Sequence, residues 1–189
     1  MELNFIVKNT EMTINQILKK EFDISTILLN KLIKNKKVLL NGNICDTRVF
    51  PNVGDCITVD LSTPEDNSNI VPTNIPLYII YEYSWLLIVN KPAGIAVHPS
   101  ILHYDNSLSN GVKFYFDKIG LNKKIRPVNR LDCNTSGLVL FAKNEYIQEC
   151  LIKQMQANIF KKEYLAICNG IFDEKQGIIN LPSARKENS

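Results

Sequence analysis

The chain has 189 residues, of which 45% are hydrophobic and 22% are charged, and its formal net charge is +3. This length allows one or two small domains with real cores, and no run of about 18 apolar residues indicates a membrane span. The N-terminus lacks the charged-then-apolar pattern of a secretory signal, so we expect a cytoplasmic protein that does not bind membranes.

The cysteines and histidines argue against cross-links and metal. The five cysteines are an odd number at wide spacings, which indicates reduced thiols rather than a disulfide framework. His98 and His103 are the only histidines, which leaves no credible set of zinc ligands. We therefore predict that the protein holds no metal.

Two short helices are expected near the N-terminus. Thr13 can cap a helix that ends near Phe22, with Ile14, Ile17 and Leu18 on one side. Ser25 can cap a second helix, and its apolar residues recur at helical spacing. These apolar residues are Leu28, Leu29, Leu32 and Ile33.

A hairpin and a further strand should follow the helix pair. Residues 38–40, the turn dipeptide Asn41-Gly42 and Ile44 predict the hairpin, and alternation over residues 57–61 predicts a half-buried strand. This order, with V-x-x-N-G and later G-D-x-I, is similar to the S4 RNA-binding domain. We predict an S4-like domain over residues 1–62. A helix-turn-helix DNA-binding domain is the alternative, and the hairpin directly after the second helix argues against it.

Basic residues gather in two stretches, residues 19–37 and 113–130. Basic surfaces of this kind bind a phosphate backbone, although the alternative for either stretch is an ordinary solvated helix face. The likeness to S4 domains implies that the helix pair and its lysines meet RNA. The candidate phosphate contacts are Lys31, Lys34, Lys36 and Lys37.

A polar, proline-interrupted stretch then separates the first domain from a second one. Residues 62–69 show no periodicity, so we predict a linker over residues 63–75 and a second domain over residues 76–189. Within that domain the patterns predict six elements. These are paired strands at 77–81 and 85–89, a helix from Ser107 to Gly120, a strand at 138–142, a helix capped by Asn144, and a strand at 164–168.

One polar loop of the second domain carries a constellation suited to catalysis. Asp132 follows Arg130 by two residues and precedes two hydroxyls and a glycine, at Thr135, Ser136 and Gly137. A carboxylate in such a loop can attack an electrophilic carbon or take a proton while its neighbours keep it ionised. The same residue types also cap ordinary turns, which is the structural alternative.

These residues match a known signature. Arg130-Leu131-Asp132 followed by Thr135-Ser136-Gly137-Leu138 resembles the R-L-D-x-x-T-S-G-L signature of the RluA-type pseudouridine synthases, which isomerise uridine in RNA. The resemblance implies that Asp132 is the catalytic residue and that Arg130 helps hold the flipped nucleotide. One position departs from the family, because Asn129 stands where a histidine usually precedes the arginine.

Two further stretches resemble the same family. Residues 90–99 match its N-K-P-A-G-x-x-V-H-P element, in which Lys91 either faces a phosphate or is packed or solvated. Residues 162–166 match its K-x-Y-x-A motif, which implies that Tyr164 stacks on the target base. Without the resemblance, Tyr164 would be an ordinary strand aromatic.

The resemblance also defines the expected fold. The family continues to a G-R-T-H-Q-I-R element that this sequence does not contain. We therefore expect an α+β protein with an S4-like domain followed by the N-terminal portion of a mixed or antiparallel-sheet catalytic domain, truncated within that domain. In the family, the missing part supplies a basic residue to the catalytic aspartate.

The predicted function is that of an RNA pseudouridine synthase with Asp132 as the catalytic carboxylate. We expect structured RNA, and ribosomal RNA in particular, as its partner, no cofactor, and a monomer when the protein is full length. An RNA-binding protein without catalysis, or an inactive fragment, is the alternative. A hydrolase that uses Asp132 would lack a second carboxylate or a histidine base at a recognisable spacing.

Overall fold

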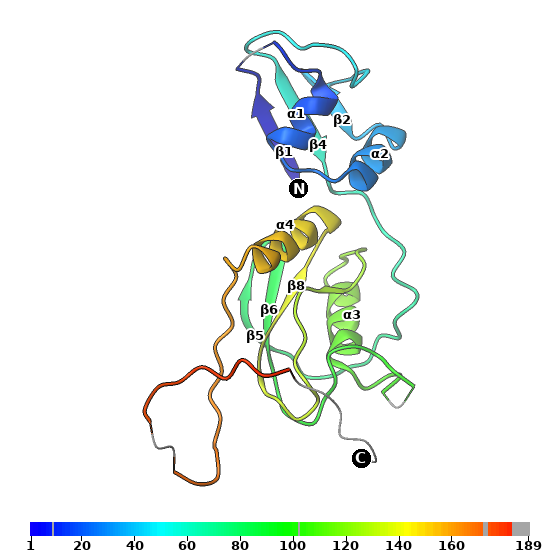
Figure 1. Ribbon diagram of the computed structural model, residues 1–189. Coiled ribbons are helices and arrows are strands. Elements are labelled where there is room, and N and C mark those ends of the chain that lie inside the picture. The colour runs from blue at the N-terminus through cyan, green and yellow to red at the C-terminus, as the bar shows by residue number, and fades with distance from the viewer. Residues whose placement is uncertain (9, 102, 172–173, 183–189) are drawn as a thin grey trace.

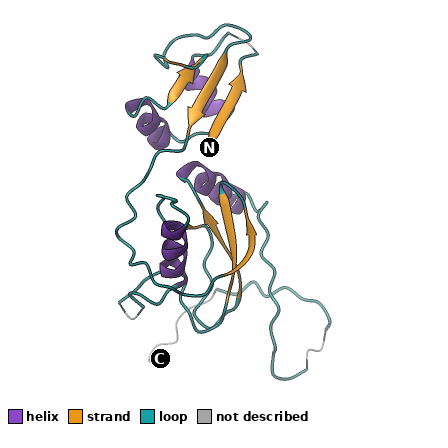
Figure 2. Cartoon of the chain, turned by 180° about the vertical axis from the view of Figure 1, so that it is seen from behind, coloured by secondary structure: helices purple, strands orange, loops and turns teal. Residues whose placement is uncertain are grey.

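The computed structural model describes residues 1–8, 10–101, 103–171 and 174–182. It is a mixed α+β structure in which two antiparallel sheets lie one above the other, each with its own hydrophobic core (Figures 1 and 2). We call residues 1–62 the N-terminal unit and residues 63–156 the second unit. None of the described helices is long and apolar enough to cross a membrane.

The N-terminal unit packs two short helices on one four-stranded sheet. Thr13 and Ser25 cap the helices through their side-chain oxygens, which confirms the predicted caps. The first helix ends at Lys20 rather than near Phe22. The elements are β1 (Glu2–Ile6), α1 (Ile14–Lys20), α2 (Thr26–Lys34), β2 (Val38–Leu40), β3 (Asn43–Ile44) and β4 (Cys56–Asp60), with strand order β1-β4-β2-β3.

Strand β1 was not predicted from the sequence. Its side chains alternate between exposed and half-buried, and Leu3 and Phe5 pack against the first core. It pairs with β4 in antiparallel register from Glu2 opposite Asp60 to Ile6 opposite Cys56. The partner strand lies far along the chain, so the strand depends on tertiary pairing more than on local preference.

The second unit contains a four-stranded sheet with a helix on one face. Helix α3 shares the second core with residues that alternate along the two central strands, as expected for a half-buried sheet. Helix α4 lies between this sheet and the N-terminal unit (Figure 1). The elements are β5 (Tyr78–Glu82), β6 (Leu86–Lys91), α3 (Leu108–Lys118), β7 (Arg126–Pro127), β8 (Gly137–Ala142) and α4 (Glu145–Gln156), with strand order β5-β6-β8-β7.

The predicted linker contains no helix or strand, but it is packed against the rest of the second unit. Glu65 donates its backbone N–H to the carbonyl of Asn122, and its carboxylate pairs with Arg126. Asn67 and Ile70 are buried, and Ile70 belongs to the second core. The stretch is therefore attached along its length.

The predicted strand at residues 164–168 is wrong. This stretch is irregular and all five of its side chains are exposed. Its apolar and aromatic residues favour a strand locally, but a strand needs a neighbour for its N–H and C=O groups. In the part of the chain that the structure describes, β8 pairs only with β6 and β7.

Candidate active site and RNA-binding surface

The predicted catalytic loop runs from β7 to β8 and is anchored at both ends. Val128 donates its N–H to the carbonyl of Leu140 at 2.7 Å. Asn129 is buried, and its side-chain amide both donates to the carbonyl of Leu138 and accepts from the N–H of Leu140. The side chain of Asn129 thus makes the two hydrogen bonds to β8 that the backbone of a neighbouring strand would otherwise make. Asn129 directly precedes Arg130.

The far end of the loop depends on a turn and a glycine. The carbonyl of Asp132 accepts the N–H of Thr135 at 3.1 Å, which closes a turn over the two residues between them. Gly137 follows with φ of +130° at the start of β8. Other residues rarely adopt this backbone angle, so a glycine is needed at this point.

Asp132 is exposed on this loop, and no described residue hydrogen-bonds to its carboxylate. The ammonium of Lys91 interacts with it electrostatically. Burial lowers the pKa of Lys91, and the negative charge of Asp132 acts in the opposite direction. Asp132 is therefore accessible to a ligand and lies in the field of a buried positive charge.

Lys91 is completely buried at the end of β6. Its ammonium donates to the carbonyls of Pro92 at 2.9 Å, Ile95 at 2.8 Å and Cys133 at 3.0 Å. Between phosphate contact and packing, the structure thus favours packing for this lysine. The Gly94 N–H also donates to the carbonyl of Cys133. The segment after β6 is consequently tied to the residue that follows Asp132.

Arg130 is also exposed, and its guanidinium lies near His98. Partial desolvation and the positive charge of Arg130 lower the pKa of His98, which keeps this imidazole neutral at neutral pH. His98 follows the segment that Lys91 holds. Two sequence elements far apart in the chain therefore meet around the loop that carries Asp132.

A cleft of about 910 Å³ opens beside the catalytic loop. This volume lies within the range of about 300–1,000 Å³ that is usual for small-molecule sites. One wall comes from the loop and β8, including Thr135 and Leu138, and the other comes from residues 160–165, including Tyr164. Leu131 and Asn134 line the cleft, whereas the residues that line it do not include Arg130 or Asp132.

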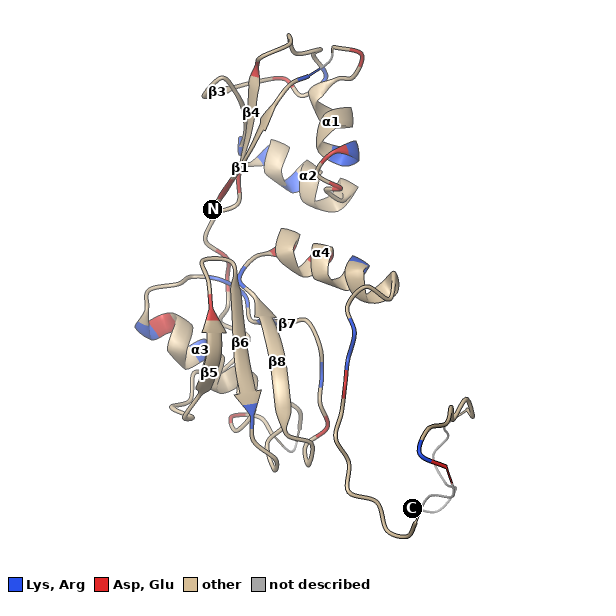
Figure 3. Ribbon diagram, turned by 90° about the vertical axis from the view of Figure 1, so that its left-hand side faces the viewer, with Lys and Arg blue, Asp and Glu red and all other residues tan. Residues whose placement is uncertain are grey.

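The four candidate lysines of the N-terminal unit have two different environments. Lys31 pairs with Glu145 at 2.6 Å and lies 3.6 Å from Glu65, and Lys37 pairs with Asp60 at 2.6 Å. Lys34 and Lys36 are exposed, and no described acidic residue pairs with either. Figure 3 marks the positive residues of α2 in blue and shows that this helix lies next to α4.

Only half of the basic residues in the second stretch lie on the surface, which corrects in part the prediction made from charge alone. Lys113, Lys123 and Arg126 are all buried. Lys113 pairs with Asp117 in the same helix, and Lys123 donates to the carbonyls of Leu61 and Thr63. These three cations are buried and bind groups within the protein, so they are not available to bind phosphates.

Comparison with known proteins decides the family. The sequence profile of the RNA pseudouridylate synthase family matches residues 85–189, which is more than half of the chain. The chain belongs to this family.

Several curated relatives resemble this family member over most of its length. An uncharacterized RNA pseudouridine synthase of Bacillus subtilis, YhcT, is 31% identical over 89% of this chain and 56% of its own. Ribosomal large subunit pseudouridine synthase D of Blochmanniella floridana is 34% identical over 81% of this chain and 49% of its own. The chain thus spans about half the length of the curated relatives that it matches.

A solved structure, human RNA pseudouridylate synthase domain containing 4, aligns with 43% of this family member and 30% of its own chain. The sequence identity is 18% and the TM-score is 0.36.

Among the described residues of the chain, no group of three or more His, Cys, Asp and Glu side chains is placed to hold a metal ion.

Sequence reasoning did not establish the structural roles of two residues in the candidate site of this family member. Asn129 was read only as a departure from the family pattern, and Lys91 had several open interpretations. The signal for Lys91 was its position directly after an apolar strand and before Pro92, where a lysine has little access to solvent. Nothing in the sequence indicated that Asn129 would bond to the backbone of β8.

Proposed function

We propose that this chain carries the catalytic aspartate of an RNA pseudouridine synthase and that it acts on structured RNA, with ribosomal RNA in the cytoplasm as the expected substrate. Membership of the family supports this proposal, and the names of the synthase D relatives support the choice of RNA. The observation that carries it is Asp132, an exposed carboxylate without a hydrogen-bond partner in the described chain, on a loop that borders a nucleotide-sized cleft.

The reaction is an isomerisation, so its atoms balance without a cofactor. The bond between N1 of uracil and C1′ of ribose breaks, the base turns, and a bond forms between C5 and C1′. The hydrogen on C5 leaves as a proton, and N1 gains one. Asp132 can stabilise positive charge at C1′, attack that carbon, or remove a proton from C2′, and the geometry is compatible with all three.

The substrate must leave its stack to reach the aspartate. Extrusion of a base costs a few kcal/mol, and stacking on an aromatic side chain returns about 1–3 kcal/mol. We assign the stacking role to Tyr164, which lines the cleft opposite the catalytic loop. We assign to Arg130 the role of holding the backbone of the flipped nucleotide, because its guanidinium is exposed on that loop.

The N-terminal unit would bind RNA as an S4-like domain over residues 1–62, attached through residues 63–75 to a catalytic domain over residues 76–189. Lys34 and Lys36 are the strongest candidates for phosphate contacts, because both are exposed and neither pairs with a described acid. Lys31 and Lys37 would have to exchange an acidic partner for a phosphate.

Replacement of the catalytic carboxylate tests the proposal. Pseudouridine formation releases tritium from RNA whose uridines are tritiated at C5, and we expect Asp132→Asn to abolish this release while RNA affinity stays within about twofold of wild type. Asp105→Asn is the matched control, because Asp105 is an exposed aspartate outside the loop. Residual tritium release by Asp132→Asn would remove Asp132 from the catalytic role.

An RNA-binding protein without catalysis is the second candidate. The observation that favours it is the state of Tyr164, which is 61% exposed on an irregular segment and makes no hydrogen bond through its hydroxyl to any described residue. This candidate predicts that the wild-type chain binds RNA but releases no tritium. The same assay therefore separates the two functions.

A further inference from the structure

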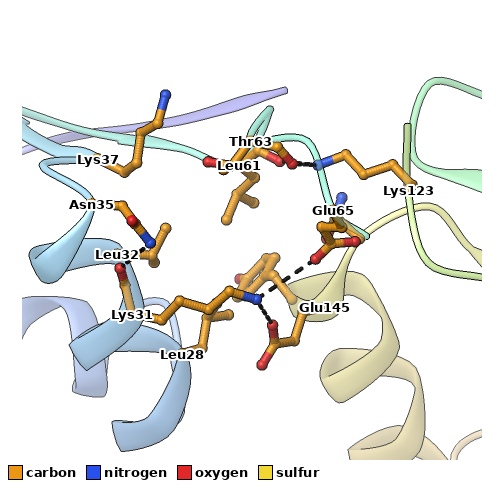
Figure 4. A pocket seen from close by; sticks show the side chains of 12 residues that line it. Leu28, Lys31, Leu32, Asn35, Lys37, Leu61, Thr63, Glu65, Lys123 and Glu145 are labelled. Carbon is orange, nitrogen blue, oxygen red and sulfur yellow. Dashed lines mark hydrogen bonds and ion pairs between the residues drawn. The ribbon is translucent and has the colours of Figure 1, made fainter. Parts of the chain in front are cut away.

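Helix α4 presents an acidic residue to the RNA-binding candidate Lys31. The ammonium of Lys31 lies 2.6 Å from Oε2 of Glu145, the first residue of α4, and 3.6 Å from Oε1 of Glu65 (Figure 4). Glu65 is itself held by Arg126 in a pair whose side chains are each 9% exposed. Glu145 is thus the partner that Lys31 can exchange, whereas Glu65 is fixed.

Further contacts along the same helix keep Glu145 opposite α2. Tyr146 packs against the core of the N-terminal unit, and its hydroxyl donates to the carbonyl of Phe22. Ser25, the cap of α2, donates to Glu149 at 2.7 Å. One helix face thus supplies both the acid and the contacts that position it, because residues four apart lie on the same face.

The ion pair between Lys31 and Glu145 is open to competition. The side chain of Lys31 is 46% exposed and that of Glu145 is 25% exposed, so solvent screens the pair. Exposed pairs of this kind are weak. Lys34 and Lys36 are exposed close to Lys31 in the sequence, so an RNA backbone that binds them would bring phosphate towards the same ammonium.

We propose that Glu145 is a built-in competitor of RNA phosphate for Lys31, so that α4 of the second unit lowers the RNA affinity of the N-terminal unit until a phosphate displaces the carboxylate of Glu145. This inference rests on the proposed RNA-binding function and adds a regulatory contact to it. It also gives the N-terminal unit a direct link to the helix that follows β8, the strand at the end of the catalytic loop.

Fluorescence anisotropy of a labelled RNA hairpin with the full chain tests the proposal. Glu145→Gln removes the competing charge and keeps the size of the side chain. We expect it to tighten RNA binding about twofold to fivefold, because the ion pair that it removes is exposed and therefore weak. The slope of log affinity against log salt concentration should steepen by at most the amount that one phosphate contact contributes. Glu2→Gln is the matched control, because it makes the same charge change on the exposed side of β1.

A double-mutant cycle excludes a general charge effect. In a Lys31→Gln background, Glu145→Gln should act no more strongly than Glu2→Gln, because the competed ammonium is absent. An equal gain from Glu145→Gln and Glu2→Gln, or a gain that persists without Lys31, overturns the proposal. Catalysis is not measured, so a failure to form pseudouridine leaves this result intact, while failure of every variant to bind the hairpin would overturn RNA binding and competition together.

Discussion

The two units of the chain hold themselves together in different ways. In the N-terminal unit, the described core consists of aliphatic side chains, and Thr47 is the only buried polar residue in the described part of that unit. The second unit buries many more polar groups, including five cations. These cations are Lys91, Lys113, Lys123, Arg126 and Lys143.

The difference follows from how much irregular chain each unit must fix. The longest connection in the N-terminal unit is residues 45–55, so apolar packing is enough to define this unit. The second unit must hold the long irregular segments 63–77, 92–107 and 128–136, which have few ladder hydrogen bonds of their own. Buried ammonium and guanidinium groups satisfy the carbonyls and carboxylates of these segments, and the candidate active site is made from two of them.

The largest test of this contrast is removal of Arg126. Its guanidinium makes two hydrogen bonds to Glu65, at 2.6 and 2.9 Å, and the pair is almost fully buried. Burial by itself would raise the pKa of Glu65, but the hydrogen bonds and charge of Arg126 outweigh it and hold that pKa below its ordinary value. We expect Arg126→Met to lower the free energy of unfolding by about 3–5 kcal/mol, measured by urea denaturation, because a buried carboxylate loses its partner.

The double variant Arg126→Met with Glu65→Leu provides the control for that measurement. It removes both charges, so it should recover much of the lost stability. Equal instability of the single and double variants would show that the pair acts through packing alone. The contrast between the two units would then be wrong for this part of the chain.

A smaller effect is expected at Lys91. Lys91→Met keeps the length of the side chain but leaves the carbonyls of Pro92, Ile95 and Cys133 without their shared donor. We expect a loss of about 2–3 kcal/mol in the free energy of unfolding, because the desolvation cost of the ammonium disappears at the same time. Amide hydrogen exchange should also be faster at Gly94, whose N–H donates to the carbonyl of Cys133.

A control separates local loosening from global unfolding in the Lys91 variant. The amide of Val89 lies in the β6 ladder within the second core, so its exchange reports on opening of the sheet. Faster exchange at Gly94 with unchanged exchange at Val89 would assign Lys91 to positioning of the loop that carries Asp132. An equal acceleration at both amides would make Lys91 a general core residue.

The sequence predicted those parts of the fold that local chemistry determines. Thr13, Ser25 and Asn144 are capping residues before apolar periodicity, and all three cap a helix in the structure. The position of Asp132 on the loop that leads into β8 follows equally from local pattern. Such features depend on residues a few positions apart, so the sequence contains the whole signal.

The features that the sequence did not predict depend on distant partners. Arg126 was counted with a basic surface because its partner, Glu65, lies in a stretch that reads as a solvated linker. The strand predicted around Tyr164 did not form, because local preference cannot supply a neighbouring strand. The roles of Asp132, Arg130 and Tyr164 stay predictions, which the assays above are designed to test.

The smallest expected effect concerns the N-terminal unit, where charges lie near the surface. Asp60 accepts from Lys37 at 2.6 Å and from Ser62. Partial burial alone would raise the pKa of Asp60, but these hydrogen bonds and the charge of Lys37 lower it from 3.8 to about 2. The stabilisation is therefore present above about pH 4 and is lost as the pH falls towards 2.

At neutral pH, we expect Asp60→Asn to cost at most about 2 kcal/mol in the free energy of unfolding, and this difference from wild type should shrink through the same pH window. Asp105→Asn, an exposed aspartate that makes no hydrogen bond to a described residue, should show no such window. A pH-independent loss in Asp60→Asn would mean that the ionised carboxylate does not stabilise this unit, and that its surface charges matter even less than the comparison with the second unit implies.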